Sequence, residues 1–276
     1  MQFFFADDAR RDKPSRKGMG PLVAIGGVVV PVDQVGGLEK VIRDLCGSFG
    51  FPPGEPFKWS PGPELWMRDN LILEKREKFF VQALSLTEKH GAKASVVIED
   101  TNRRPAMSDK SPEEDVVCMF LERVDNKFRL SGEEGIVVVD RPSGGRVDEN
   151  KFLQNCSETI LSGTQYVRPE HIALNVLSSP AAHVRLLQVA DVVTSCTLSF
   201  ASGENKYSPP VFEAIKRLLL RDLFGRVGGI GLKIHPDLRY ANLYHWLVGD
   251  GYIRKGNVEI PLPIKRFPYS ADPDIP

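Results

Sequence analysis

The sequence has no net charge, few cysteines and histidines, and no long hydrophobic run. Its 36 lysines and arginines balance 36 aspartates and glutamates, so a polyanion such as nucleic acid would have to be held by local basic patches. The four cysteines contain no CxxC pair and the five histidines form no HExxH motif, which argues against structural zinc and zinc hydrolase chemistry. The longest apolar stretches, such as VAIGGVVV, are too short to span a membrane.

The remaining composition, with 42% hydrophobic and 26% charged residues, is that of an ordinary globular protein. The apolar first residues are followed at once by Asp7 and Asp8, a pattern that does not match a secretory signal. We therefore expect a cytoplasmic protein without a membrane segment, whose scattered cysteines are buried, reduced thiols.

Apolar, strand-like runs alternate with segments of helical periodicity along most of the chain. Strands are expected at 2–6, 21–31, 93–100, 135–144 and 171–177, and helices at 34–48, 64–90, 111–130, 148–161, 181–201 and 209–224. This alternation predicts an α/β fold with a largely parallel sheet and helices on both faces, in which the first two strands can pair antiparallel. A domain over residues 1–225 is expected, followed by an irregular, Gly- and Pro-rich extension over 226–276 that packs on it.

Three of the predicted buried strands end in acidic residues, at Asp7 and Asp8, at Glu99 and Asp100, and at Asp140. Functional groups of an open α/β sheet gather at the carboxyl ends of its strands, so these acids are expected along one edge. Oxygen ligands without His or Cys favour Mg²⁺ or Mn²⁺. Two other interpretations stay open: the first pair can belong to a turn, and the acids can form salt bridges with nearby arginines.

Two further segments contain candidate site residues. In the predicted helix 181–201, Gln188 and Asp191 lie three positions apart, and the Asp is flanked by apolar residues within LLQVADVV. The Pro-bounded segment GEPFKWS contains Glu55 and Lys58. The basic tract RRDKPSRK, which follows the first acids, is a candidate phosphate contact.

Four of these segments, FADDA, EPFKWS, IVVVD and LLQVAD, resemble in order the motifs of the family catalogued as domain of unknown function 3800. Members of that family have a first strand leading into Asp-Glu-Ser, a Glu-x-x-Lys segment, a strand ending in Asp, and a Gln-x-x-Asp helix. The family is generally assigned to the ribonuclease H-like superfamily and is suspected to contain metal-dependent nucleases, often encoded near phage-defence or mobile elements. The present chain departs from the pattern at Asp8, where the family usually has Glu, at Ala9, where it usually has Ser, and in the tract 10–17, which lacks the usual Gly.

The resemblance implies a ribonuclease H-like mixed sheet with helices on both faces. It places four catalytic, metal-binding carboxylates on Asp7, Glu55, Asp140 and Asp191, with Asp8 as an additional metal ligand. Lys58 and Gln188 would support the site, Lys58 at a phosphate or at Glu55, and Gln188 beside Asp191.

Such a carboxylate site would hold two Mg²⁺ or Mn²⁺ ions about 4 Å apart and hydrolyse phosphodiester bonds of DNA or RNA. Two alternatives remain open. One is a catalytically inactive ribonuclease H-like module that binds nucleic acid or a partner protein, and the other is a phosphoester hydrolase that acts on a small nucleotide.

Overall fold

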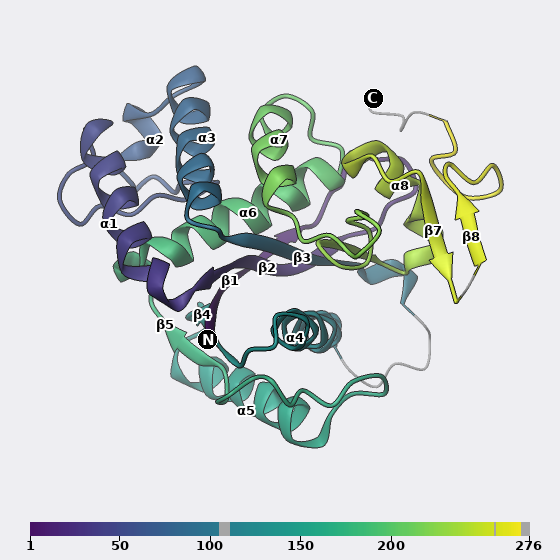
Figure 1. The fold of residues 1–276 in the computed structure, drawn as a ribbon. Helices are drawn as coiled ribbons and strands as arrows, with labels where there is room; N and C mark the ends of the chain where they lie inside the picture. Colours follow the sequence, from purple (N-terminus) through teal and green to yellow (C-terminus); the bar gives the residue numbers. More distant parts are fainter. Residues whose placement is uncertain (105–110, 257, 272–276) are drawn as a thin grey trace.

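The computed structural model describes residues 1–104, 111–256 and 258–271, and within them a six-stranded mixed sheet lies between two layers of helices (Figure 1). The sheet contains β1 (Gln2–Arg11), β2 (Leu22–Pro31), β3 (Lys93–Asp100), β4 (Gly135–Asp140), β5 (Leu177–Ser179) and β6 (Leu232–His235), and a separate hairpin contains β7 (Tyr252–Lys255) and β8 (Val258–Pro261). The helices are α1 (Val32–Ser48), α2 (Met67–Asn70), α3 (Glu74–Lys89), α4 (Pro112–Leu130), α5 (Arg146–Ser162), α6 (Arg185–Ala201), α7 (Ser208–Leu218) and α8 (Asp237–Val248), with 3₁₀ turns at Thr101–Arg103 and Ala181–His183. None of the helices in these ranges combines the length and apolarity that crossing a lipid bilayer requires.

The strands are arranged in the order β5-β4-β1-β2-β3-β6. Strand β2 runs antiparallel to both of its neighbours, whereas β1 pairs with β4, β4 with β5, and β3 with β6 in parallel. The predicted α/β class, with helices on both faces, is therefore confirmed. The antiparallel first pair of strands is also confirmed.

Side chains of β1 alternate between two hydrophobic cores, one on each face of the sheet, as the period of a strand requires. Phe4 and Ala6 pack with α4 and α5, and the Phe4 ring meets that of Phe120 edge to face at a centroid distance of 5.1 Å. Phe5 points to the opposite core, where α1, α3, α6 and α7 cover the sheet (Figure 1). Both faces of β1 are covered, which explains its unbroken apolar sequence.

Helix α6 is the most enclosed helix and packs directly across β1 and β2. Its buried residues occupy nearly every position, because the sheet lies beneath it and α1, α3 and α7 surround it. The polar side chains Gln188 and Asp191 are therefore held at fixed positions against the sheet, with 1% and 8% of their surfaces exposed.

Two predicted elements differ from the observed ones. The helix expected over 64–90 is divided into α2 and α3, because the Arg76 side chain binds the carbonyl oxygens of Met67, Arg68 and Leu71 and so ends α2. The strand expected over 171–177 is displaced: Ile172 forms only an isolated bridge, and the regular pairing with β4 begins at Leu177.

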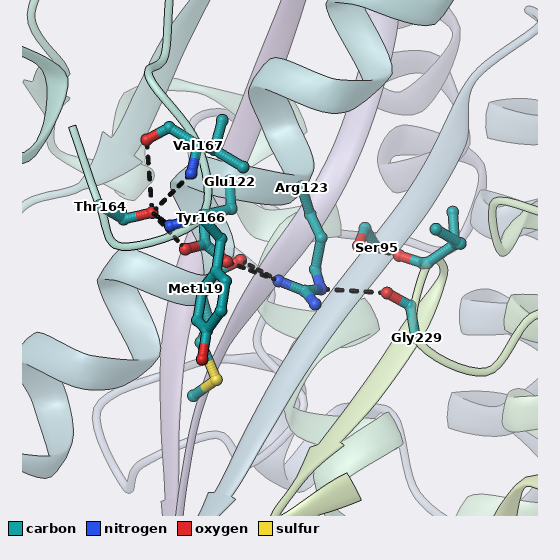
Figure 2. A network of polar contacts seen from close by, with 9 residues as sticks. Ser95, Met119, Glu122, Arg123, Thr164, Tyr166, Val167 and Gly229 are labelled. Atoms are coloured by element: carbon teal, nitrogen blue, oxygen red, sulfur yellow. Dashed lines mark hydrogen bonds and ion pairs between the residues drawn. The ribbon is translucent and has the colours of Figure 1, made fainter. Parts of the chain in front are cut away.

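The segment after residue 225 was predicted to be irregular, and this prediction is wrong for much of it. Strand β6 joins the main sheet beside β3, and α8 follows it. Figure 2 shows a polar contact that holds this segment: Arg123 of α4 donates from Nε to the Gly229 carbonyl at 3.1 Å. The same side chain donates from Nη1 to the Met119 carbonyl of its own helix at 2.7 Å. Its neighbour Glu122 accepts from the Thr164 hydroxyl, which ties α4 to the loop after α5 as well.

If β6 is an integral strand, truncating its core side chain must destabilise the whole protein. Ile234 is fully buried, so Ile234→Ala is expected to lower the free energy of unfolding by about 2–5 kcal/mol. The matched control is Ile72→Ala, at a residue with 57% exposure, which should change it by no more than about 0.5 kcal/mol. Urea titration followed by circular dichroism measures both, and equal effects would show that β6 is not part of the core.

Candidate functional site

Three carboxylates from distant parts of the sequence meet where the parallel pairing of β1 with β4 ends, because β1 itself continues past the predicted end at residue 6 to Arg11. Ala6 pairs with Val139 in the parallel ladder, so Asp7 and Asp140 follow on adjacent strands, one residue further along each. Asp191 comes from α6, which packs across β1. The charges of Asp191 and Asp140 both act on Asp7, and that of Asp140 acts on Asp191. We refer to Asp7, Asp140 and Asp191 as the acidic cluster.

Asp7 has the most perturbed environment of the cluster. Burial, and to a lesser extent repulsion from Asp191, Asp140 and Asp8, together raise its pKa to about 9, although the hydrogen bond from Asp8 N–H acts in the opposite direction. Burial likewise raises the pKa of Asp191, although the Trp59 N–H and the charge of Lys58 oppose this effect. Burial also raises the pKa of Asp8, against the charge of Arg10. Without a cation, the fully ionised cluster is therefore unfavourable.

Hydrogen bonds from the main chain orient each carboxylate of the cluster. Asp7 Oδ1 accepts from the Asp8 N–H at 2.8 Å, and Asp140 Oδ1 accepts from the N–H groups of Arg141 and Ala181, each at 2.8 Å. Asp191 Oδ2 accepts from the Trp59 N–H at 2.6 Å. Among the described residues, no hydrogen bond is recorded to Oδ2 of Asp7 or of Asp140, so these oxygens remain available to another ligand.

Neither alternative interpretation of the strand-end acids holds for the cluster. Strand β1 continues through Asp7 and Asp8 to Arg11, so the pair does not lie in a turn. Within the described ranges, no ion pair joins Asp7, Asp140 or Asp191 to a lysine or arginine. The third predicted pair differs, because Glu99 binds Arg104 and Asp100 accepts from Gly20 N–H and the Tyr240 hydroxyl. Asp100 is thus a structural residue that joins β3 to α8.

The donor set of the acidic cluster fits a hard divalent cation, because it offers carboxylate oxygens that form no ion pair with any lysine or arginine that the structure describes. In the part of the chain that the structure describes, no group of three or more His, Cys, Asp or Glu side chains has the arrangement of a ready-made metal site. Binding a cation would therefore require the side chains of the cluster to draw closer together.

Gln188 organises the backbone around the cluster. Its Oε1 accepts from Phe57 N–H at 3.3 Å and from Arg185 at 2.8 Å, while its Nε2 donates to the Ala181 carbonyl at 2.7 Å. The same Ala181 donates its N–H to Asp140. Gln188 thus holds both the loop that binds Asp191 and the turn that binds Asp140.

The structure does not bring Glu55 into the acidic cluster. Its Oε1 accepts from the Trp66 N–H at 2.7 Å, so the side chain closes the loop between residues 55 and 66. Its carbonyl oxygen accepts from the guanidinium of Arg185, a buried cation that the sequence gave no reason to select. Lys58, three residues on, does lie near the cluster, since its charge lowers the pKa values of both Asp8 and Asp191.

Two cavities adjoin the cluster and share Asp140, Pro142 and Ser143 in their walls. The larger, of 530 Å³, also contains Asp7 and Asp8 in its wall and extends between the sheet and helices α4 and α5. The smaller, of 390 Å³, is lined by Lys58, Arg141 and Gln188. Asp140 therefore lines both cavities and Asp7 the larger one, so two members of the cluster border a space that a substrate could enter.

Of the basic tract RRDKPSRK, which begins in the last two residues of β1, only Arg10 lines one of these two cavities. Arg10 lines the larger cavity and forms an ion pair with Glu113 at 2.7 Å. Arg16 is buried instead, donates to the Ala201 carbonyl at 2.8 Å and lies over the Tyr269 ring. It is therefore a packing residue and does not contact a phosphate.

Comparison with known proteins adds no family to this description. No protein-family model matches the chain, and no curated protein is recognisably similar to it.

The raised pKa of Asp7 predicts that removing its charge stabilises the metal-free protein. The folded-state pKa lies above the ordinary value of 3.8, so the contribution of this group to stability is complete below about pH 4 and is lost as the pH rises to about 9. The amide of Asp7→Asn can still accept from Asp8 N–H, but it does not ionise, so the variant does not lose stability in this way as the pH rises. Around pH 8 and without metal, it should raise the free energy of unfolding by roughly 1–3 kcal/mol.

Thermal unfolding across this pH range measures the effect, with Asp44→Asn at an exposed position of α1 as the control. The gain of Asp7→Asn should grow with pH, and that of the control should not. A destabilised Asp7→Asn protein at high pH would show that the carboxylate is satisfied in the native state.

Proposed function

We propose that the protein is a metal-dependent nuclease that hydrolyses phosphodiester bonds of DNA or RNA. The observation that supports this function best is the convergence of Asp7, Asp140 and Asp191 beside two cavities, three buried or partly buried carboxylates that form no ion pair with a lysine or arginine of the described ranges. A site of oxygen ligands without histidine is typical of Mg²⁺- or Mn²⁺-dependent phosphoryl chemistry.

The sheet supports a ribonuclease H-like fold. Its strands β3-β2-β1-β4-β5, with β2 reversed and the others parallel, follow the order of a ribonuclease H-like sheet, and β6 adds to the β3 edge. The first carboxylate is on the central strand β1 and the next on its parallel neighbour β4. The fold and the motif resemblance are independent arguments for the same class of enzyme.

Asp7, Asp140 and Asp191 would hold the metal, with Asp8 beside them at the mouth of the larger cavity. When bound, Mg²⁺ or Mn²⁺ supplies an activated water and neutralises charge on the phosphoryl group in transition. The chain itself orients Asp191 through Trp59 N–H and Asp140 through Ala181 N–H, both fixed by the hydrogen bonds of Gln188.

Lys58 is the residue best placed to receive the phosphate. It lines the smaller cavity with Arg141, and only one carboxylate, that of Asp140, shares this wall. Cationic side chains here would hold the substrate backbone without reading its sequence. Glu55 is left out of the metal set, because its carboxylate is bound to Trp66 N–H.

The function predicts that Mg²⁺ or Mn²⁺ activates cleavage of single-stranded or duplex DNA or RNA, measured by gel electrophoresis of labelled substrates. Asp7→Asn, Asp140→Asn and Asp191→Asn should each lower kcat by at least about a hundredfold, because each removes a charge that the metal requires. Glu55→Gln should retain activity within a few fold, since the amide oxygen can still accept from Trp66 N–H.

The control for the aspartate variants is Asp44→Asn, which should match the wild type. Loss of activity in Glu55→Gln as large as in Asp7→Asn would place Glu55 in the metal set. Metal-independent binding without turnover would instead identify an inactive nucleic-acid-binding module, and turnover of free nucleotides alone would identify a small-molecule hydrolase.

A further inference from the structure

We propose that the larger cavity receives a single unpaired nucleobase of the substrate, so that the enzyme acts on single strands or on bases that have left a duplex. This inference rests on the proposed function for the identity of the ligand. It is carried by the shape, the lining and the charge of the cavity, which the hydrolytic chemistry does not use.

The floor of the cavity is apolar and comes from both strands and helices. Val23 and Ile25 of β2 and Val139 of β4 form the sheet side, and the helix side contains Val116 and Val117 of α4 with Phe152 of α5. Its volume of 530 Å³ lies within the range of roughly 300–1,000 Å³ that is typical of small-molecule pockets. The Phe152 ring, which is partly buried, offers a surface on which a base can pack.

The rim has hydrogen-bonding groups on three sides. Arg10 of β1 pairs with Glu113 of α4, and Asn155 of α5 donates to Glu114 at 3.1 Å. Lys151 lies on α5 as well. A flat, neutral ring with polar edges fits this combination of apolar floor and polar rim.

The charge of the cavity favours a base over a phosphate. Apart from the carboxylates proposed to lie at the metal, Asp7, Asp8 and Asp140, its wall contains three acids, Glu113, Glu114 and Asp148, and two cations, Arg10 and Lys151. This balance offers a phosphate no net attraction, whereas a neutral base needs none. The smaller cavity shares Asp140 with the larger one and otherwise has two cations, Lys58 and Arg141, and no acid in its wall.

The two cavities together therefore suit one nucleotide bound across Asp140, which lines both of them. Its phosphate would lie toward Lys58 and Arg141, and its base would enter the space between β2, α4 and α5. A base stacked and paired inside a duplex cannot occupy that space and must first leave the stack.

A filled cavity tests this arrangement. Asn155→Phe places a ring at the rim, and Lys151→Phe does so from an exposed residue one helical turn earlier, which keeps the test valid if the first variant does not fold. The matched control is Gln154→Phe, at an exposed position of α5 outside the cavity wall. Thermal unfolding verifies that each variant is folded.

The probe is a short single-stranded DNA in which 2-aminopurine replaces adenine, with Ca²⁺ in place of Mg²⁺ to prevent turnover. Binding to the wild type should increase 2-aminopurine fluorescence, because the base leaves its neighbours, and the same sequence as a duplex should not respond. Asn155→Phe or Lys151→Phe should remove this increase and weaken binding about tenfold or more. A strand with abasic sites at the same positions should bind the wild type as weakly as the 2-aminopurine strand binds the filled variants. Filling the cavity should not weaken the binding of this abasic strand further.

The result that overturns the inference is a fluorescence increase and an affinity in both filled variants equal to those of Gln154→Phe, or a wild type that does not distinguish the 2-aminopurine strand from the abasic one. These outcomes are separate from failure of the proposed function. A wild type without Mg²⁺- or Mn²⁺-dependent cleavage that still shows the base-dependent signal would retain the base pocket and refute the nuclease. Metal-dependent cleavage by the wild type, with no change of fluorescence or affinity in either filled variant, would support the nuclease and refute the base pocket.

Discussion

Repulsion among carboxylates that are buried or partly buried is the constraint on which the site depends. Parallel pairing of β1 with β4 brings Asp7 beside Asp140, and the packing of α6 on β1 adds Asp191 from the other side. Burial and mutual repulsion both act against ionisation of Asp7, and no ion pair within the described ranges relieves them. The fold thus maintains an unfavourable arrangement that a divalent cation would relieve, as expected where stability is exchanged for function.

A second layer of hydrogen bonds keeps this arrangement in place. Gln188 is 1% exposed, and its amide joins the loop that contains Phe57 to the turn that contains Ala181. Through those two segments it fixes the donors to Asp191 and Asp140. The two cavities that share Asp140 also differ in charge, with cations in the one toward α6 and an apolar, acid-rimmed wall in the one toward α4 and α5.

Much of this could be predicted from the sequence, because strand periodicity and strand-end acids are local signals. They predicted the α/β class with helices on both faces and singled out Asp7 and Asp140 as candidates, and the polar pair within the apolar helix singled out Gln188 and Asp191. The mixed sheet was implied by the family resemblance, whereas the alternation of elements alone predicted a largely parallel one. What could not be predicted depends on contacts between distant segments. Arg76 divides a helix by binding carbonyls of the preceding turn, and Glu55 is drawn to Trp66 N–H. Tertiary packing likewise places Glu99 beside Arg104 and pairs β6 with β3 in the sheet.

The central claim is that Asp7, Asp140 and Asp191 act together as a cation site. Crystals of the protein soaked in Mn²⁺ and measured at a wavelength where manganese scatters anomalously test this directly. We expect an anomalous difference peak within coordination distance of carboxylate oxygens from all three residues, and its loss in crystals of Asp140→Asn. Saturating Mn²⁺ with no peak among these side chains, or a peak coordinated only by other residues, would contradict the account.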